Sequence, residues 1–388
     1  MNRIIVTIVF CIGWMVCCAQ TKPVAVGAEA TNEYFPLLKG KRIAVLSNHT
    51  GMVGNEHLVD LLKRKDFNVV CIFSPEHGFR GNADAGEHVS SSMDEKTGIP
   101  ILSLYDGDTG KPSVKSMSLF DVLVFDLQDV GLRFYTYYAT MVRMMDACAE
   151  SQKKMIILDR PNPNGHYVDG PILDMKYKSG VGWLPIPVVH GMTLGELAMM
   201  VNGEKWLPEG RICDISVIKC KNYTHQTMYQ LPIPPSPNLP TMKAVYMYPS
   251  TCYFEATPVS LGRGTDKPFL VYGHPNMLNY SFSFTPRSIP GAKNPPQLNK
   301  ICYGVDLSNL SDSDIWKKGV DLTYLIDAYT NLNMGDHFFS SFFEKLIGVS
   351  YVREMIKDGC SADEIKKKWS DDVEKFKKQR APYLLYQE

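Results

Sequence analysis

The sequence has no excess of charge of either sign, since 41 Lys and Arg residues balance 41 Asp and Glu residues. A chain without net charge has no general attraction for nucleic acid or for an anionic membrane, so its partners must be selected by a local site. Beyond the first 20 residues, no apolar run approaches the roughly 20 residues that a membrane helix requires. We therefore expect neither a nucleic-acid partner nor a transmembrane segment.

Several motifs of common enzyme classes are also missing. The segment NHTGMVGN, Asn48 to Asn55, stands where a dinucleotide-binding fold would carry Gly-x-Gly-x-x-Gly, and no Gly-x-x-x-x-Gly-Lys-Ser/Thr occurs. The Gly-x-Ser-x-Gly nucleophile elbow of α/β-hydrolases is absent as well. These absences predict an enzyme without a nucleotide cofactor, and we expect no cofactor of any kind.

The cysteines and histidines lack the spacing of a metal site. No Cys-x-x-Cys pair, His-x-His or His-x-x-x-His occurs, and the cysteines beyond the N-terminus are odd in number: Cys71, Cys148, Cys213, Cys220, Cys252, Cys302 and Cys360. This pattern argues against a zinc cluster and against a disulfide framework. We expect mostly buried thiols, although Cys213 and Cys220 could bridge in an oxidising compartment.

The N-terminus predicts export. Residues 1–20 carry one cation, an apolar run from Ile4 to Val16 and small residues near Ala19, which together are typical of a secretory signal peptide. The protein would then be periplasmic or secreted. Cys17 or Cys18 could accept a lipid after cleavage, which would tether the protein to a membrane.

Short apolar runs recur along the first half of the chain and predict parallel strands. These runs are Arg42–Ser47, Asn68–Ser74, Ile99–Tyr105, Asp121–Gln128 and Lys154–Arg160, with a further strand over Trp183–Val189. Most are β-branched and apolar on both faces, as in strands buried between helix layers. Helical spacing separates several of them, in His57–Lys65 and Tyr137–Ser151, and Thr193 with Glu196 forms a capping box before another helix. The alternation predicts an α/β fold with a doubly wound, mostly parallel sheet.

The composition of the sequence changes at residues 231–240, LPIPPSPNLP. So many prolines are not tolerated in a helix or in a central strand. We expect a first domain over 33–230 and a smaller second domain over 231–388. The charged segment near the C-terminus, residues 362–380, predicts a helix with a solvated face.

Four predicted strands end in dense polar sequence: NHTG, SPEHGFRG, DLQDVGLRFYTY and DRPNPNG. Because the carboxyl ends of parallel strands share one edge, where ligands bind in open α/β sheets, these segments should form one crevice. Its carboxylates would be Glu76, Asp126, Asp129 and Asp159; its cations Arg80, Arg133 and Arg160; and its aromatic surfaces Phe79, Tyr135 and Tyr137. Carboxylates of this kind suit glycoside hydrolysis, and arginines suit an anionic substituent.

Glu76 is the leading catalytic candidate within this set. Pro75 fixes the chain before it, Gly78 frees the loop behind it, and His77 and Arg80 are near enough to set its pKa. A carboxylate with a tuned pKa could protonate a leaving oxygen. The alternative is a salt bridge or a helix cap, and for Asp126 and Asp159, directly at strand ends, a turn or cap role is the favoured reading.

The motifs SPEHGFRG, DLQDVGLRFYTY, DRPNPNG, HGMTLGELA, PPSPNLP and FEATPVSLGRGTDKPF occur in this order and together resemble the bacterial exo-β-N-acetylmuramidases. The resemblance implies a Rossmann-like first domain, a smaller α+β second domain that closes the cleft, and release of N-acetylmuramic acid from the non-reducing end of peptidoglycan fragments. It places Glu76 and Glu255 at the catalytic positions. The substrate-binding positions that we expect are His77, Arg80, Asp129, Arg133, Tyr135, Arg160, Asn162, His190, Arg263 and Thr265. Muramyl saccharides derived from peptidoglycan would be the partners.

Three residues depart from the usual pattern of this family: Ser250, Ala256 and His166 stand where glycine is common. Their larger side chains would narrow the crevice. The residues leave two other functions open, an exported sugar- or muropeptide-binding protein without catalysis and a metal-dependent hydrolase of cell-wall peptides. They also leave open whether hydrolysis retains or inverts the anomeric configuration or uses the N-acetyl group.

Overall fold

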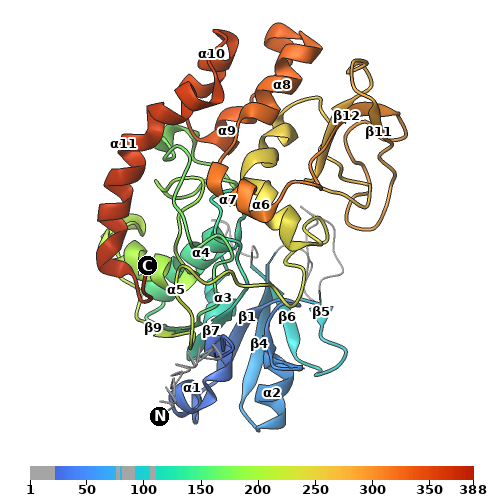
Figure 1. Cartoon of the computed structure of the whole chain (residues 1–388). Helices are drawn as coiled ribbons and strands as arrows, with labels where there is room; N and C mark the ends of the chain where they lie inside the picture. Colours follow the sequence, from blue (N-terminus) through green and yellow to red (C-terminus); the bar gives the residue numbers. More distant parts are fainter. Residues whose placement is uncertain (1–21, 76–78, 81–91, 105–110) are drawn as a thin grey trace, which may run out of the picture.

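The computed structural model describes residues 22–75, 79–80, 92–104 and 111–388 (Figure 1). Its main sheet has the strand order β5-β6-β4-β1-β7-β8-β9. The strands are β1 (Ile43–Ser47), β4 (Val69–Ser74), β5 (Ser92–Met93), β6 (Pro100–Ser103), β7 (Val122–Asp126), β8 (Lys154–Leu158) and β9 (Ile215–Ile218). All neighbours pair in parallel except β5 with β6. The predicted α/β fold with a mostly parallel sheet is confirmed.

Both faces of the central strands of this sheet are buried, which explains their runs of apolar residues. In β1, Ala44 and Leu46 belong to one hydrophobic cluster, whereas Ile43 and Val45 belong to another. Alternate side chains of a strand point to opposite faces, so the two clusters are the two sides of the sheet. The first side packs against α4 (Tyr137–Glu150) and α5 (Leu194–Gly203), and the second against α1 (Thr31–Leu38) and α2 (Leu58–Arg64).

The predicted capping box at the start of α5 is confirmed. The Thr193 side chain accepts a hydrogen bond from the Glu196 amide, and the Glu196 side chain accepts one from the Thr193 amide. These two bonds satisfy amides that a helix leaves open at its first turn. They fix the place at which α5 leaves the carboxyl edge of the sheet.

The prediction of a strand over Trp183–Val189 is wrong. Val189 makes only isolated bridges, to Leu132 and Asp169. Pro185 and Pro187 have no amide hydrogens, so the segment cannot complete a ladder of hydrogen bonds. The strand that extends the sheet beyond β8 is β9, whose sequence ISVI is too short to stand out as an apolar run.

The second domain follows the proline-rich segment 231–240, which forms no helix or strand. It contains a three-stranded antiparallel sheet of β10 (Val271–His274), β12 (Cys302–Asp306) and β11 (Phe282–Phe284). Its helices are α6 (Met242–Thr251), α7 (Asp312–Lys318), α8 (Thr323–Leu332), α9 (Phe343–Ile347), α10 (Tyr351–Lys357) and α11 (Ala362–Arg380). Figure 1 shows α11 running down beside the first domain, so that the C-terminus lies next to α5. The larger hydrophobic cluster extends from the first domain into this one.

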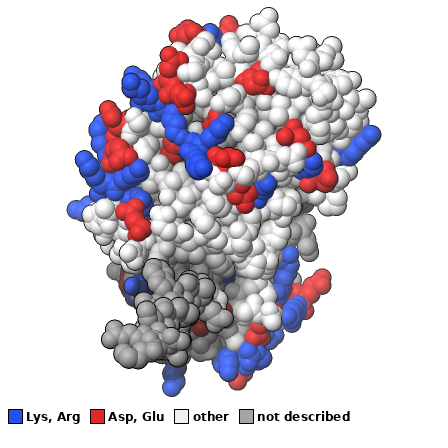
Figure 2. All heavy atoms as spheres, viewed as in Figure 1, with Lys and Arg blue, Asp and Glu red and all other residues white. Residues whose placement is uncertain are grey.

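Charged side chains of both signs are interspersed along the edge that α10 and α11 form (Figure 2). Helix α11 buries a stripe of Ile365, Trp369, Val373 and Phe376 and exposes most of its charged residues. The prediction of a helix with a solvated face is therefore confirmed. Within the described part of the chain, no helix is long and apolar enough to cross a membrane.

The seven cysteines among the described residues are free thiols, and all but Cys360 are buried. The Cys213–Cys220 bridge that the sequence left open is not formed, because the Cys220 thiol instead donates to the carbonyl of Asp159 at 3.2 Å. The described residues contain no group of His, Cys, Asp and Glu side chains suited to a metal ion.

Candidate active site

The ends of β1, β7 and β8 meet at the carboxyl edge of the sheet, as their order in the sequence predicted. The Gln128 amide, just after β7, donates to the Thr50 hydroxyl, just after β1, at 3.2 Å. The Gln128 side chain reaches the carbonyl of Pro161, after β8, at 2.8 Å. These contacts hold the three loops together as one surface.

The proline-rich segment lies across this edge and connects it to the second domain. His49 Nε2 lies 2.9 Å from the carbonyl of Pro234, and the Tyr135 hydroxyl donates to the carbonyl of Pro235 at 2.8 Å. Four residues along from Pro234, the Asn238 side chain donates to the carbonyl of Gly291 in the second domain at 2.8 Å. The segment thus spans from the sheet edge to a cavity of which Gly291 is part.

That cavity has a volume of about 380 Å³ and contains an ion pair of Glu255 with Arg263. Its described lining consists of Glu255, Leu261, Arg263, Gly291, Ala292, Lys293, Asn294, Pro295 and Pro296. Glu255 lies on a 3-10 turn, Cys252–Ala256, directly after α6. Arg263 Nη2 lies 2.7 Å from Glu255 Oε1, and each side chain is about one quarter exposed, 25% and 24%. A carboxylate next to a guanidinium therefore opens onto a space large enough for part of a sugar.

Two glycines shape the loop that carries Arg263. Gly262 and Gly264 adopt φ angles of 82° and 80°, a conformation that favours glycine. A Cβ at Gly264 would also lie 2.4 Å from the carbonyl oxygen of Arg287. Burial by itself would lower the pKa of Arg263, but the charge of Glu255 outweighs it and raises that pKa. Arg263 therefore stays charged beside the cavity.

Two of the predicted site residues, Glu76 and His77, lie outside the described residues. The strand that precedes them, β4, ends at Ser74, and the described chain includes Phe79 and Arg80 after them. Arg80 is held by two aspartates, with Nη2 2.9 Å from Asp94 and 3.3 Å from Asp60. Its charge is balanced within the protein by Asp60 on α2 and by Asp94 after β5, and its role in substrate binding stays a prediction.

Arg160 is also taken up by an internal partner. Its guanidinium binds both oxygens of Asp126, at 2.6 and 3.0 Å, and donates to the carbonyl of Met52 at 3.0 Å. The Asp126 side chain is fully buried and that of Arg160 is 6% exposed. This buried pair joins the ends of β7 and β8, and the substrate-binding role of Arg160 stays a prediction.

Arg133, which we predicted to bind substrate, makes an extensive set of internal contacts. Its side chain is fully buried, and it donates four hydrogen bonds of 2.7 to 2.9 Å to the carbonyls of Pro171, Ile186, Leu346 and Ile347. Two of these carbonyls belong to the first domain and two to helix α9 of the second. Arg133 therefore joins the two domains through its two Nη atoms. Its Nε has no hydrogen-bond partner among the described residues.

Two further residues predicted to bind substrate, Asn162 and Thr265, make hydrogen bonds within local structure. The Asn162 side chain donates to the carbonyl of Met192 and accepts from the amide of Asn164. The Thr265 hydroxyl donates to the carbonyl of Gly262 at 2.6 Å and closes the turn after Arg263. Both side chains thus stabilise loops at the site rather than facing a ligand.

His190 is fully buried at the start of the loop before α5. Its Nδ1 accepts a hydrogen bond from the Met192 amide at 3.3 Å. Burial, aided by the charge of Arg380, lowers the pKa of His190 to about 3. The imidazole is therefore neutral at physiological pH and contributes no charge to substrate binding.

The family departures at Ser250 and Ala256 do not narrow this cavity, whose described lining includes neither residue. The Ser250 hydroxyl instead donates to the carbonyl of Gly319 at 3.1 Å and accepts from the amide of Asp321 at 2.9 Å. The ring of His166 packs edge-on against Trp316, with 5.7 Å between the ring centroids. These side chains stabilise contacts between elements instead.

Asp129, after β7, is a buried acid near the crossing proline segment. Its Oδ1 accepts from the Gly131 amide at 2.7 Å, while Oδ2 has no hydrogen-bond partner among the described residues. Burial raises the pKa of Asp129 to about 7, against the opposing effect of the backbone donors. A carboxyl group with such a pKa holds a proton near neutrality, which is a property of general acids but also of a buried structural acid.

This raised pKa gives a testable pH dependence of stability. The pKa of Asp129 is near 3.8 in the unfolded chain and about 7 in the folded protein. The contribution of this group to folding stability is therefore fully present below pH 4 and is lost as the pH rises through 7. We expect Asp129→Asn, which keeps Oδ1 and removes the ionisation, to flatten the fall in melting temperature between about pH 4 and 7. Calorimetry at several pH values across this range measures the melting temperatures of both proteins.

Asp121→Asn is the matched control for this experiment. Hydrogen bonds from Arg42 lower the pKa of Asp121 to about 2, so this group affects stability at more acidic pH. Its removal should leave the slope between pH 4 and 7 unchanged. An Asp129→Asn protein with the wild-type slope would show that Asp129 is already ionised at pH 5.

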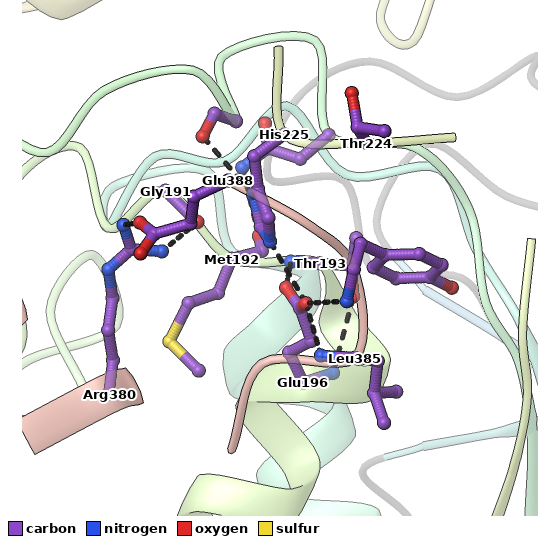
Figure 3. Close-up of polar contacts among 12 residues, drawn as sticks. Gly191, Met192, Thr193, Glu196, Thr224, His225, Arg380, Leu385 and Glu388 are labelled. Atoms are coloured by element: carbon purple, nitrogen blue, oxygen red, sulfur yellow. Dashed lines mark hydrogen bonds and ion pairs between the residues drawn. The ribbon is translucent and has the colours of Figure 1, made fainter. Parts of the chain in front are cut away.

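Sequence reasoning missed a cluster that fastens the C-terminal tail to the first domain (Figure 3). Fully buried Glu196 accepts hydrogen bonds from His225 at 3.0 Å and from the Leu385 amide at 2.8 Å. The Tyr386 hydroxyl donates to Asp159 Oδ2 at 2.7 Å, and burial raises the pKa of Asp159 to about 6. The capping box pointed to Glu196 as a helix residue, but no local signal could pair it with the tail. Asp159 is thus a structural acceptor, as its strand-end position suggested.

Comparisons with known proteins match nearly the whole chain. Residues 43–243 match the family described as exo-beta-N-acetylmuramidase NamZ, N-terminal, and residues 246–386 match its C-terminal counterpart. The chain is 38% identical over 374 residues to the peptidoglycan beta-N-acetylmuramidase NamZ of Bacillus subtilis, which covers 91% of this chain and 89% of that protein.

Two crystal structures of DUF1343 family proteins from Bacteroides fragilis share the fold. One is 71% identical, with a TM-score of 0.89, and the match covers 95% of this chain and 100% of the other. The second is 29% identical, with a TM-score of 0.78, and the match covers 94% and 99%.

Proposed function

Since the chain belongs to the exo-beta-N-acetylmuramidase NamZ family, we propose that it is a glycoside hydrolase that releases N-acetylmuramic acid from the non-reducing ends of peptidoglycan fragments. The curated relative acts on peptidoglycan as a beta-N-acetylmuramidase. The observation in this chain that carries the proposal is the cavity in which Glu255 and Arg263 lie side by side.

The charges that line the cavity support a sugar with an anionic substituent. Glu255 contributes one negative charge, while Arg263 and Lys293 contribute two positive ones. The lining therefore carries a net positive charge even with Glu255 ionised. N-acetylmuramic acid differs from N-acetylglucosamine by a lactyl group that ends in a carboxylate, and a cationic lining would favour the former.

The ion pair suggests which role Glu255 takes in hydrolysis. An opposite charge at 2.7 Å favours the ionised form of a carboxyl group. An ionised Glu255 could stabilise the positive charge that develops on the sugar ring or activate a water molecule. Glu76, placed by its sequence after β4, would then protonate the glycosidic oxygen, so that the leaving group departs as an alcohol and water supplies the new hydroxyl at the anomeric carbon.

The proposal includes export, because peptidoglycan lies outside the cytoplasmic membrane. Residues 1–20 have the pattern of a signal peptide, and cleavage would yield a periplasmic or secreted protein, with Cys17 or Cys18 as the candidates for a lipid tether. Intact-mass analysis of protein recovered from a cell envelope tests this. A mature protein that retains residues 1–20 would contradict it.

The activity is tested with two matched substrates, a chromogenic β-N-acetylmuramide and the corresponding β-N-acetylglucosaminide. We expect the purified protein to release the chromophore from the muramide and to discriminate against the glucosaminide, which lacks the carboxylate. Assays between about pH 4 and 8 allow for the ionisation of both carboxyl groups. Binding of the muramide without turnover at any of these pH values would instead indicate a sugar-binding protein.

A further inference from the structure

Two buried cysteines outside the candidate site belong to the same hydrophobic cluster. Cys148 is in the last turns of α4, and Cys213 lies just before β9. Their exposed fractions are 0% and 2%. The Cys213 thiol acts on the Cys148 thiol through a hydrogen bond that raises the pKa of Cys148, although 64 residues separate the two in the sequence.

Ion pairs hold the two segments side by side. Arg211, two residues before Cys213, donates to Asp146 at 3.0 Å and lies 2.9 Å from Glu150. Asp146 and Glu150 flank Cys148 on α4. Arg211 therefore holds the segment that carries Cys213 against α4 by contacts on both sides of Cys148.

The backbone of Cys213 is clamped as well. Its amide donates to Asn202 Oδ1 at 3.0 Å, and its carbonyl accepts from Asn202 Nδ2 at 2.8 Å. Asn202 lies on α5, so this clamp is independent of the ion pairs to α4. Two sets of contacts from different helices thus hold the backbone around Cys213 in place beside α4.

We propose that Cys148 and Cys213 are a site of disulfide formation that locks α4 to the segment before β9 when the chain folds in an oxidising compartment. One thiolate attacks an external disulfide to form a mixed disulfide, and the second displaces the external thiol. The two cysteines lose two protons and two electrons, and the external disulfide is reduced to two thiols. The co-reactant is a small-molecule disulfide or an exported oxidoreductase whose own active-site cysteines are in the disulfide form.

Burial restricts when this exchange can occur. The hydrogen bond with Cys213, together with burial, raises the pKa of the Cys148 thiol well above its usual range, so little thiolate forms in the folded protein. Exchange should therefore be fast during folding and slow afterwards. The bond would close a loop of roughly 65 residues, which restricts the unfolded chain and stabilises the fold.

The test is to refold the purified chain with glutathione and glutathione disulfide and to map disulfides by mass spectrometry after alkylation of free thiols. We expect a linked peptide pair containing Cys148 and Cys213, and a melting temperature raised by roughly 5–10 °C over the reduced protein. Peptide mapping needs no variant, so it remains decisive if substitutions impair folding. Seven alkylated thiols, or a link between other cysteines such as Cys213 and Cys220, would overturn the proposal.

Two matched variants separate this bond from general thiol oxidation. Cys213→Ala should abolish the difference in melting temperature between oxidised and reduced protein. Cys71→Ala removes another buried thiol, on β4, and should keep that difference. Neither outcome depends on glycosidase activity, so this proposal and the proposed function can fail separately.

Discussion

Glu255→Gln is expected to lower kcat on the chromogenic muramide by at least about 100-fold, because removal of a catalytic carboxylate commonly costs a factor of 10²–10⁴. The substitution keeps the size of the side chain and its reach to Arg263 but removes the negative charge. The pair is one quarter exposed, so solvent screening keeps its effect on stability within about 1 kcal/mol. Rates of chromophore release and melting temperatures measure the two effects separately.

Glu344→Gln is the matched control, since it breaks a similar ion pair elsewhere in the second domain. Glu344 Oε1 lies 2.6 Å from Arg353 Nε, and the side chains are 15% and 22% exposed. This variant should keep nearly full turnover. If both variants lost activity equally, the loss would come from the stability of the domain, and a fully active Glu255→Gln protein would remove Glu255 from the chemistry.

The sheet could be predicted because its physical cause is local in the sequence. A strand covered on both faces is apolar on both sides, and β1, β4, β7 and β8 each show a run of four or five consecutive apolar residues. Strand β9 lies at the sheet edge and is only partly buried at three of its four positions, so its sequence carries no such run. The Trp183–Val189 segment was mistaken for a strand because it is apolar. Its apolar residues belong to the larger hydrophobic cluster, but the segment forms no strand of the sheet.

The site was harder to predict because the sequence does not show which charges neutralise each other. Arg80 and Arg160 looked like cations available to a substrate, but each is held by aspartates far from it in the chain. Arg263, which the family resemblance pointed to, lines a cavity and pairs with Glu255, only eight positions before it in the sequence. Contacts within a few residues can be inferred from sequence, whereas contacts such as Glu196 with Leu385 depend on the completed fold.

Arg133→Met should destabilise the protein severely, because it removes four hydrogen bonds that join the two domains. The side chain donates at 2.7 to 2.9 Å to Pro171 and Ile186 in the first domain and to Leu346 and Ile347 in the second. Burial lowers the pKa of Arg133 to about 10, so the group is still charged at neutral pH. Each buried carbonyl left without a donor costs about 1–3 kcal/mol, which makes the total at least about 4 kcal/mol.

A loss of this size should lower the melting temperature by roughly 10 °C. Since Arg133 spans the interface, we also expect the single unfolding transition to separate into two as the domains lose their connection. Arg133→Lys keeps the charge but cannot reach four carbonyls with one ammonium group, so it should be nearly as unstable. Arg287→Met, at an exposed arginine that donates to Asn299, should change stability by less than about 0.5 kcal/mol. Wild-type stability of Arg133→Met would mean that water or neighbouring donors satisfy the four carbonyls, and that the domains are held together by the apolar contact between them alone.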